Sequence, residues 1–310
     1  MRDDEKKQDG LTRRQVTAAG VVGLAGIAAA PAILSSSPKQ TSGAAMNRMP
    51  VAFFPHGGGP WPFVDLGFPK RELEELETYL KGVPALTKQT PKAIVIVSAH
   101  WEERVPTVMT APKPPMLYDY DGFPEESYRI TWPAPGSPAV GKRVRELLGA
   151  AGIESAEDPS RGFDHGAFVP LKVMYPEAQI PTIQLSLEAG LDPEEHLRIG
   201  RALAPLRDEG VFLVGSGETF HNLRAFRDPR FGPLSNEFDQ WLQAASTAAP
   251  ASRDAQLGAW LKAPHARLVH PREEHLIPLM VIAGAAGEDK GTTSYVGSLM
   301  GMTHSGYHFG

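Results

Sequence analysis

The sequence contains no cysteine among its 310 residues. Without thiols the chain can form no disulfide, no thiolate metal site, no iron–sulfur cluster and no cysteine nucleophile. A metal bound to this protein would therefore have to be held by histidine and carboxylate ligands.

The sequence also lacks an excess of positive charge. Its formal net charge is −5, and no block of like charges interrupts it, whereas a nucleic-acid-binding protein usually carries a basic patch. Hydrophobic residues make up 42% and charged residues 22% of the chain, which excludes collagen-like, coiled-coil and wholly disordered proteins. We therefore expect a small molecule as the partner, and no nucleic acid.

Residues 1–48 have the order of a bacterial export signal followed by a linker. Arg13 and Arg14 precede an apolar run, residues 16–34, that is rich in Ala, Gly and Val and ends in small residues suited to cleavage. Adjacent arginines before a weakly hydrophobic run resemble the twin-arginine type, although Val16 stands where an aromatic residue or Leu is often found. We expect transport by the twin-arginine export machinery and a periplasmic or exported protein. An uncleaved membrane anchor and a buried helix are the alternatives.

The rest of the chain, residues 49–310, suits one large α/β domain or two closely joined halves. Short β-branched apolar runs indicate buried strands, and amphipathic stretches between them indicate helices. The strands are expected at residues 51–54, 93–97, 182–187 and 211–214. The helices are expected at residues 70–81, 138–151, 193–208, 236–248 and 273–285. This alternation predicts a mostly parallel central sheet with helices on both faces.

Three histidines follow predicted strands. His56 comes after the first strand and precedes three glycines, His100 comes after the second, and His221 follows a Gly-Ser-Gly turn after the fourth. Because the carboxyl ends of parallel strands meet at one edge of a sheet, we expect these side chains to lie together. The glycines would let substrate or dioxygen approach the backbone closely. His221 fits either a proton-transfer residue or a metal ligand.

Two further histidines have a suggestive context. His165 lies in a turn before an apolar stretch and could hydrogen-bond an anion or a phenol. His275 is expected on the apolar face of the helix at residues 273–285, where a metal would give a buried imidazole its partner. Glu273 and Glu274 either complement the positive end of that helix or supply a carboxylate ligand. No role is expected for His196, His265, His304 or His308. Imidazole and carboxylate donors suit Fe(II), Mn(II) or Zn(II).

Seven short motifs occur in order between residue 49 and the C-terminus. They are Phe54-Pro-His56-Gly-Gly-Gly-Pro60, Val97-Ser-Ala-His100-Trp101, Tyr118-Asp-Tyr-Asp-Gly-Phe-Pro124, Pro133-Ala-Pro-Gly-Ser-Pro138, Gly162-Phe-Asp-His165-Gly166, Gly215-Ser-Gly217 with His221-Asn-Leu223, and Glu274-His275-Leu-Ile-Pro-Leu279. Together they resemble the class III extradiol ring-cleavage dioxygenases, the protocatechuate 4,5-dioxygenase β-subunit superfamily. Within it the likeness is closest to the single-chain 4,5-DOPA extradiol dioxygenase type.

The resemblance implies a role for each matching histidine. His56, His100 and His275 would hold the metal, His221 would be the catalytic acid/base or a further ligand, and His165 would line the substrate pocket as the second catalytic candidate. The metal is expected to be Fe(II) for activity, and Zn(II) fits the same ligands. The substrates would be a DOPA-like or related catechol and O₂, and the product would be a ring-opened semialdehyde.

Trp101, Tyr118, Tyr120 and Phe123 are candidates for an aromatic pocket around the substrate, and packing within the core is the alternative for each.

Two features depart from the family pattern. The family usually has Gly-Ser-Pro after His-Gly, whereas this chain has Gly58-Gly59-Pro60, so any role of that serine hydroxyl is absent. More distant members use two histidines and one glutamate, while the pattern here favours His275 over Glu274. A zinc-dependent hydrolase and a non-catalytic binding protein on the same fold are the competing functions. The oligomeric state stays open, with a homo-oligomer as one alternative.

Overall fold

The computed structural model of the chain describes residues 48–226 and 228–310. The expected export signal and linker at residues 1–48 lie outside this part, except for Arg48. Within the described ranges, no helix combines the length and the apolar character that crossing a membrane requires.

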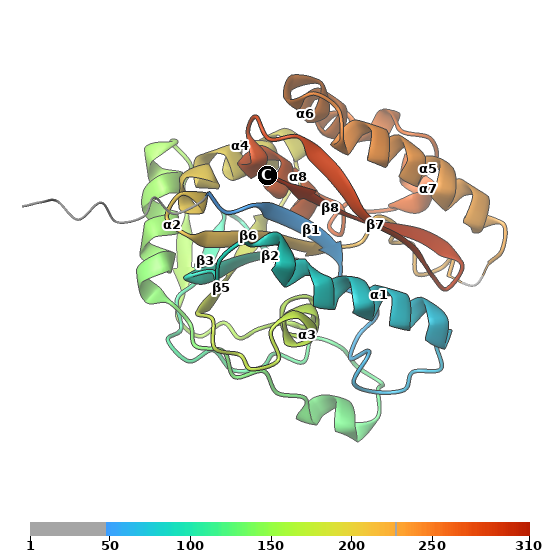
Figure 1. Cartoon of the computed structure of the whole chain (residues 1–310), viewed down its shortest axis with the longest axis horizontal. Coiled ribbons are helices and arrows are strands. Elements are labelled where there is room, and N and C mark those ends of the chain that lie inside the picture. The colour runs from blue at the N-terminus through green and yellow to red at the C-terminus, as the bar shows by residue number, and fades with distance from the viewer. Residues whose placement is uncertain (1–47, 227) are drawn as a thin grey trace, which may run out of the picture. The chain divides into compact units, whose positions relative to one another are not determined.

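An eight-stranded sheet forms the centre of the fold, with the strand order β4-β3-β5-β2-β6-β1-β8-β7 (Figure 1). The strands are β1 Val51–Pro55, β2 Ala93–Glu103, β3 Thr107–Met109, β4 Ala156–Asp158, β5 Thr182–Glu188, β6 Val211–Gly217, β7 Gly291–Leu299 and β8 Met302–Phe309. The four central strands, β5, β2, β6 and β1, are parallel. The pairs β3–β5, β1–β8 and β7–β8 are antiparallel, so the sheet is mixed only toward its edges.

Helices cover both faces of this sheet (Figure 1). The α-helices are α1 Lys70–Gly82, α2 Pro138–Ala150, α3 His165–Met174, α4 Pro193–Leu203, α5 Phe231–Ser246, α6 Pro250–Gly258, α7 Ala266–Val269 and α8 Ile277–Ala286. Short 3₁₀ helices lie at Val83–Leu86, Glu125–Arg129, Ala204–Arg207 and Trp260–Lys262. Helix α3 packs on β2 and β6 from one face and contacts α1, whereas α8 packs on β1, β2 and β6 from the other face and contacts α4. The predicted α/β fold with a mostly parallel sheet is confirmed.

The structure extends or shifts several predicted elements. Strand β2 continues through His100 to Glu103, and the predicted Gly-Ser-Gly turn is the end of β6. The predicted helix at 193–208 becomes α4 followed by a 3₁₀ helix, because Pro205 cannot donate the backbone hydrogen bond that a continuing α-helix needs. Strands β3, β4, β7 and β8 and helices α3, α6 and α7 were not predicted.

The predicted helix start at residue 273 is wrong. Helix α8 begins at Ile277, with Pro278 in its first turn, where a missing backbone N–H costs nothing. His275 therefore lies in the turn that precedes α8, and not on its apolar face. The side chain is buried all the same, with 4% of its surface exposed.

Two glycines of β6 allow this turn to approach the sheet closely. A Cβ atom at Gly217 would lie 2.1 Å from the backbone oxygen of His275, and one at Gly215 would lie 2.9 Å from that of Pro278. The backbone N–H of Glu218 donates a hydrogen bond to the same His275 oxygen, at 2.9 Å. The position of His275 thus depends on the absence of side chains at the end of β6.

We predict that Gly217→Ala destabilises the protein, because the new methyl group must displace the His275 backbone. The free energy of unfolding should fall by about 1–3 kcal/mol, as for other overpacked sites. Gly149→Ala is the matched control, since a Cβ atom at this helical position meets nothing within 4 Å. It should raise the free energy of unfolding by about 0.5–1 kcal/mol, because Ala is the better helix former. Urea denaturation of both variants tests this, and equal stabilities would contradict it.

Candidate metal centre

Three histidines meet at the carboxyl edge of the parallel strands. His56 follows β1, His100 lies near the end of β2, and His275 comes from the turn held against β6. One ring nitrogen of each lies within 4.8 Å of the others, and the Nε2 atoms of His56 and His100 are 3.1 Å apart. Two nitrogens that bind one ion at about 2.1 Å are separated by roughly 3 Å when they lie at right angles. The arrangement therefore fits a shared metal ion.

The sheet register accounts for the position of His100. The pairing of β2 with β5 shifts between Val97 and Glu102, so the intervening residues form an irregular, bulged segment. Bulges of this kind re-aim side chains and are frequent next to active sites. His100 is directed toward His56 from this segment, with ring centroids 4.9 Å apart.

Each of the three imidazoles has its Nδ1 atom beside an oxygen atom. His56 Nδ1 lies 3.1 Å from the Ser216 hydroxyl, His100 Nδ1 lies 3.6 Å from an Asp119 carboxylate oxygen, and His275 Nδ1 lies 2.9 Å from Glu274 Oε1. Such partners fix the tautomer and the ring orientation of metal-binding histidines. They leave Nε2 of each ring available as a metal ligand.

Burial keeps these three imidazoles neutral. It lowers the pKa values of His56, His100 and His275 well below their ordinary value, and the neighbouring histidines contribute in the same direction. A neutral imidazole has the lone pair that a metal needs, whereas an imidazolium does not. The donor set therefore suits a divalent cation.

A dyad of His165 and Asp119 lies beside His100. The first residue of α3 is His165, whose backbone N–H and Nδ1 atom both lie 2.8 Å from Asp119 Oδ1. Its ring centroid is 3.9 Å from that of His100. Burial raises the pKa of Asp119, but the hydrogen bonds from His165 and the proximity of His100 outweigh burial, and the pKa is lowered overall. An ionised Asp119 thus holds the His165 ring at the metal centre.

A second dyad, His221 with Glu274, lies on the other side. His221 Nδ1 is 2.9 Å from Glu274 Oε1, and the ring stacks on His275 with centroids 3.3 Å apart. Burial raises the pKa of Glu274, but the hydrogen bond from His221, a backbone hydrogen bond and the nearby His221 and Arg272 charges together outweigh burial, and the pKa is lowered. Glu274 Oε1 therefore lies beside both His221 and His275, a contact that orients the two rings.

The ligand atoms also allow two other metal-binding groups. One is His100, Asp119 and His165, and the other is His221, Glu274 and His275. In each of these, the carboxylate already faces the Nδ1 atoms of its histidines. We therefore regard the group of three histidines as the primary candidate.

A cavity of about 310 Å³ opens over these histidines. Its wall is mainly apolar and comes from several loops. The lining residues outside the five histidines are Gly57, Gly58, Gly59, Phe68, Tyr120, Phe123, Glu218, Leu223, Phe226, Leu299 and Met300. Of the aromatic candidates from the sequence, Tyr120 and Phe123 line the cavity, whereas Trp101 and Tyr118 do not. The size and the apolar wall suit a small aromatic ligand.

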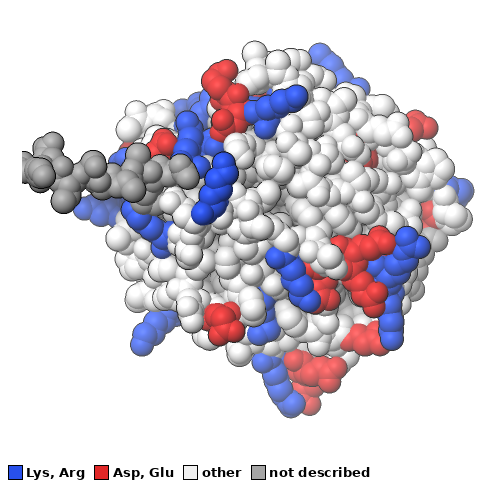
Figure 2. Space-filling view, in the orientation of Figure 1, with Lys and Arg blue, Asp and Glu red and all other residues white. Residues whose placement is uncertain are grey.

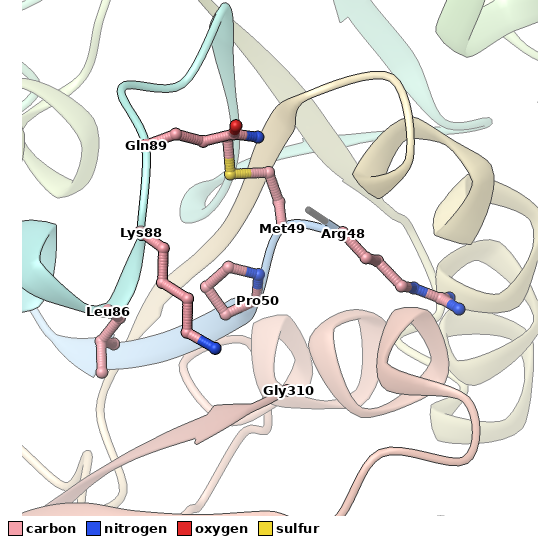
Figure 3. A pocket seen from close by; sticks show the side chains of 7 residues that line it. All are labelled: Arg48, Met49, Pro50, Leu86, Lys88, Gln89 and Gly310. Carbon is pink, nitrogen blue, oxygen red and sulfur yellow. The ribbon is translucent and has the colours of Figure 1, made fainter. Parts of the chain in front are cut away.

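A second hollow in the described part of the chain has none of this chemistry. It measures about 220 Å³ and is lined by Arg48, Met49, Pro50, Leu86, Lys88, Gln89 and Gly310 (Figure 3). No histidine or carboxylate side chain contributes to it. On the face of the molecule in Figure 2, basic and acidic side chains are interspersed, with no continuous basic patch.

Sequence reasoning missed the oxygen-bearing residues that support the histidines. Asp119 lies in a motif that stood out only for its aromatic residues, and Ser216 and Glu218 adjoin the histidine motif after β6. Glu273, which the sequence offered with Glu274 as a possible carboxylate ligand, is ion-paired with Arg267. The available signal was position, since Asp119 and Ser216 lie within motifs already recognised and Glu218 directly follows one.

The remaining histidines lie away from the three-histidine group. His196 is buried and lies against the backbone of Asp192 and Glu188, and His265 is paired with Glu237. His304 is buried beside Glu218, with Nδ1 2.6 Å from Oε2.

Comparisons with known proteins agree with this geometry. Residues 50–310 match the family described as the catalytic LigB subunit of aromatic ring-opening dioxygenase. The chain is 40% identical over 240 residues to a 4,5-DOPA dioxygenase extradiol of Beta vulgaris, covering 76% of this chain and 87% of the relative. It is 36% identical over 241 residues to a protein of the same name from Escherichia coli K12, covering 77% and 85%. A dioxygenase tasH of Hapsidospora irregularis is 36% identical over 280 residues, covering 86% of each chain.

A solved structure has the same fold. The crystal structure of an uncharacterized protein from Escherichia coli K12 superposes with a TM-score of 0.69 at 33% sequence identity. The match covers 85% of this chain and 100% of that one. The present chain thus combines this fold and the histidine arrangement described above with relatives that are named as extradiol dioxygenases.

The buried His270 makes stability depend on pH. Its Nε2 atom lies 3.0 Å from the Thr219 backbone oxygen, and burial lowers its pKa from 6.5 to about 3. Below about pH 6.5 the unfolded chain binds a proton that the folded chain does not, so the free energy of unfolding falls as the pH decreases, by up to about 1.4 kcal/mol per pH unit for this group. In the metal-free protein, His270→Gln should reduce this slope by about that amount between about pH 6 and pH 4.

Urea denaturation at several pH values measures the slope. The control is His265→Gln, a change at the less buried histidine paired with Glu237, and we expect it to leave the slope as in the unmodified protein. A slope that is the same in His270→Gln and the unmodified protein would contradict the prediction.

Proposed function

The chain belongs to the LigB family and is an extradiol ring-cleaving dioxygenase, and from this premise we propose that it opens the ring of a catechol with O₂ at an Fe(II) ion held by His56, His100 and His275. The observation that carries the proposal is the convergence of three neutral imidazoles in an apolar cavity, those of His56 and His275 buried and that of His100 partly exposed. Zn(II) fits the same ligands, but it has no redox chemistry with which to activate O₂.

The metal site leaves room for the substrates. When bound, a divalent metal with three protein ligands supplies open coordination positions for a catechol and for O₂. The aromatic ring would lie in the cavity that Tyr120, Phe123 and Phe226 line. These apolar side chains orient the ring and exclude water from the reaction.

Two histidines would transfer protons. A catechol must lose a proton when it binds, and a proton must be returned when the ring opens. His221 Nδ1 faces Glu274, so Nε2 is the atom of His221 that would take up and release the proton. His165 has the same arrangement with Asp119, so its Nε2 would accept a hydrogen bond from a catechol hydroxyl within the cavity. The product is a ring-opened semialdehyde that contains both oxygen atoms of O₂.

The first experiment is anaerobic loading of residues 49–310 with Fe(II), followed by addition of air and a panel of catechols that includes DOPA and protocatechuate. We expect O₂ consumption together with a new near-UV/visible absorbance from the ring-opened product. Full iron occupancy without O₂ uptake for any catechol would contradict the proposal.

Two variants separate metal binding from proton transfer. His56→Ala should lose both iron and activity, because it removes a ligand. His221→Ala should retain iron and lose activity by about 10²–10⁴-fold, the usual contribution of an acid/base group. Loss of iron in His221→Ala would instead identify His221 as a ligand. Iron content measured by mass spectrometry distinguishes the two results.

Asp119 provides a test of the support for His165. We expect Asp119→Asn to lower kcat by about 10–100-fold, because the loss of an orienting carboxylate typically has this effect. Asp121→Asn is the matched control, since the exposed Asp121 accepts a hydrogen bond from the backbone N–H of Gly122, a neighbour in the chain. The proposal requires a clear difference between these two variants in steady-state O₂ uptake at equal iron content.

A further inference from the structure

A buried serine of the central sheet lies between a candidate metal ligand and helix α3. Ser216 belongs to β6 and has no exposed surface. Its side chain points to the face of the sheet opposite to that of Gly215 and Gly217, which lie against α8 and the turn before it. The Ser216 hydroxyl oxygen lies 3.1 Å from His56 Nδ1, and the hydroxyl donates a hydrogen bond to the backbone oxygen of Gly166, in the first turn of α3.

The Gly166 oxygen needs this donor because of a proline one helical turn later. In an α-helix, the backbone oxygen of residue 166 accepts a hydrogen bond from the N–H of residue 170. Here residue 170 is Pro170, inside α3, and proline has no N–H. The Ser216 hydroxyl supplies the missing donor. Without it, a buried carbonyl group would lose a hydrogen-bond partner, which is unfavourable.

This hydrogen bond decides which nitrogen of His56 carries the proton. A serine hydroxyl has a single proton to donate, and that of Ser216 is directed to Gly166. The Ser216 oxygen is therefore an acceptor toward His56, which requires a proton on Nδ1. A neutral imidazole carries only one ring proton, so Nε2 keeps the lone pair that binds a metal.

We propose that Ser216 is a positioning residue: through its bond to the helix carbonyl that Pro170 leaves without a donor, it holds His56 in the tautomer with Nδ1 protonated and Nε2 free. The inference rests on the proposed role of His56 as a metal ligand and adds the contact that prepares this ligand before the metal binds. The other tautomer would place a proton between the Nε2 atoms of His56 and His100, which are 3.1 Å apart.

The tautomer can be measured in the metal-free protein without changing the site. Nitrogen-15 NMR of protein labelled at histidine, recorded at neutral pH, distinguishes a protonated ring nitrogen from an unprotonated one. The spectrum of His56→Gln identifies the His56 signals by their loss. We expect a proton on Nδ1 of His56 and none on Nε2. A proton on Nε2 in the unmodified protein would overturn the inference.

Ser216→Ala removes the directing oxygen. The Fe(II) affinity, measured anaerobically by competition with a chelator, should fall by about 10–100-fold, the usual effect of losing a partner of a metal ligand. The NMR spectrum should show that His56 no longer has a single tautomer. Ser235→Ala is the matched control, because Ser235 is also buried, donates to the Gly232 oxygen and accepts from the Thr303 N–H, but lies outside the cavity lining. Unchanged affinity in Ser216→Ala, or an equal loss in both variants, would overturn the inference.

Pro170→Ala tests the other end of this chain of contacts. The new N–H can bond the Gly166 oxygen, which releases the Ser216 proton toward His56 Nδ1. We expect a mixture of His56 tautomers and an Fe(II) affinity that falls toward that of Ser216→Ala, although α3 gains a hydrogen bond. Pro193→Ala is the control, since Pro193 lies in the first turn of α4, where no N–H is needed. A single His56 tautomer with unchanged affinity in Pro170→Ala would contradict the inference.

The outcomes separate this inference from the proposed function. If the tautomer and the Fe(II) affinities are as expected but no catechol consumes O₂, the proposed function fails and the inference stands. If catechols consume O₂ but His56 carries its proton on Nε2 in the metal-free protein, the inference fails alone.

Discussion

The site depends on keeping several imidazoles neutral at close range. The rings of His56, His100 and His275 lie about 5 Å apart, so protonation of one would place a positive charge beside the other two. Burial and mutual proximity both disfavour the charged forms. Oxygen atoms behind the rings then fix which nitrogen carries the remaining proton. The central sheet therefore holds the imidazoles in the neutral form that a metal requires and also fixes their positions.

The backbone of the sheet supplies the precision that this arrangement requires. In the middle of the sheet the parallel strands are ordered β2-β6-β1, and their carboxyl ends deliver His100, Glu218 and His56. The turn that carries His275 is fixed to the same edge through the Glu218 backbone N–H. Ladder hydrogen bonds thus control the distances between functional groups, which is why a one-atom change at Gly217 is expected to matter.

The sequence was informative where function follows from local pattern. A buried apolar run followed by a histidine placed His56 and His100 at the same edge of the sheet, because the carboxyl ends of parallel strands share one edge. The turn that carries His275 could not be predicted, since an apolar stretch with Pro278 near its start fits helices that begin at either 273 or 277. Glu218 and His304, 86 positions apart, pair only because the C-terminal hairpin packs beside β1. That hairpin was missed because its strands mix polar and apolar residues without regular alternation.

The floor and the wall of the cavity come from different parts of the fold. Its floor comes from the sheet and the buried turn before α8, whereas much of its wall comes from connections between elements, including Phe123 and the β7–β8 turn with Met300. Connections tolerate substitution and insertion far better than a central sheet does. The catalytic apparatus and the choice of substrate can therefore diverge separately: an ancestral chain could acquire a new aromatic substrate through changes in these connections while inheriting its chemistry intact.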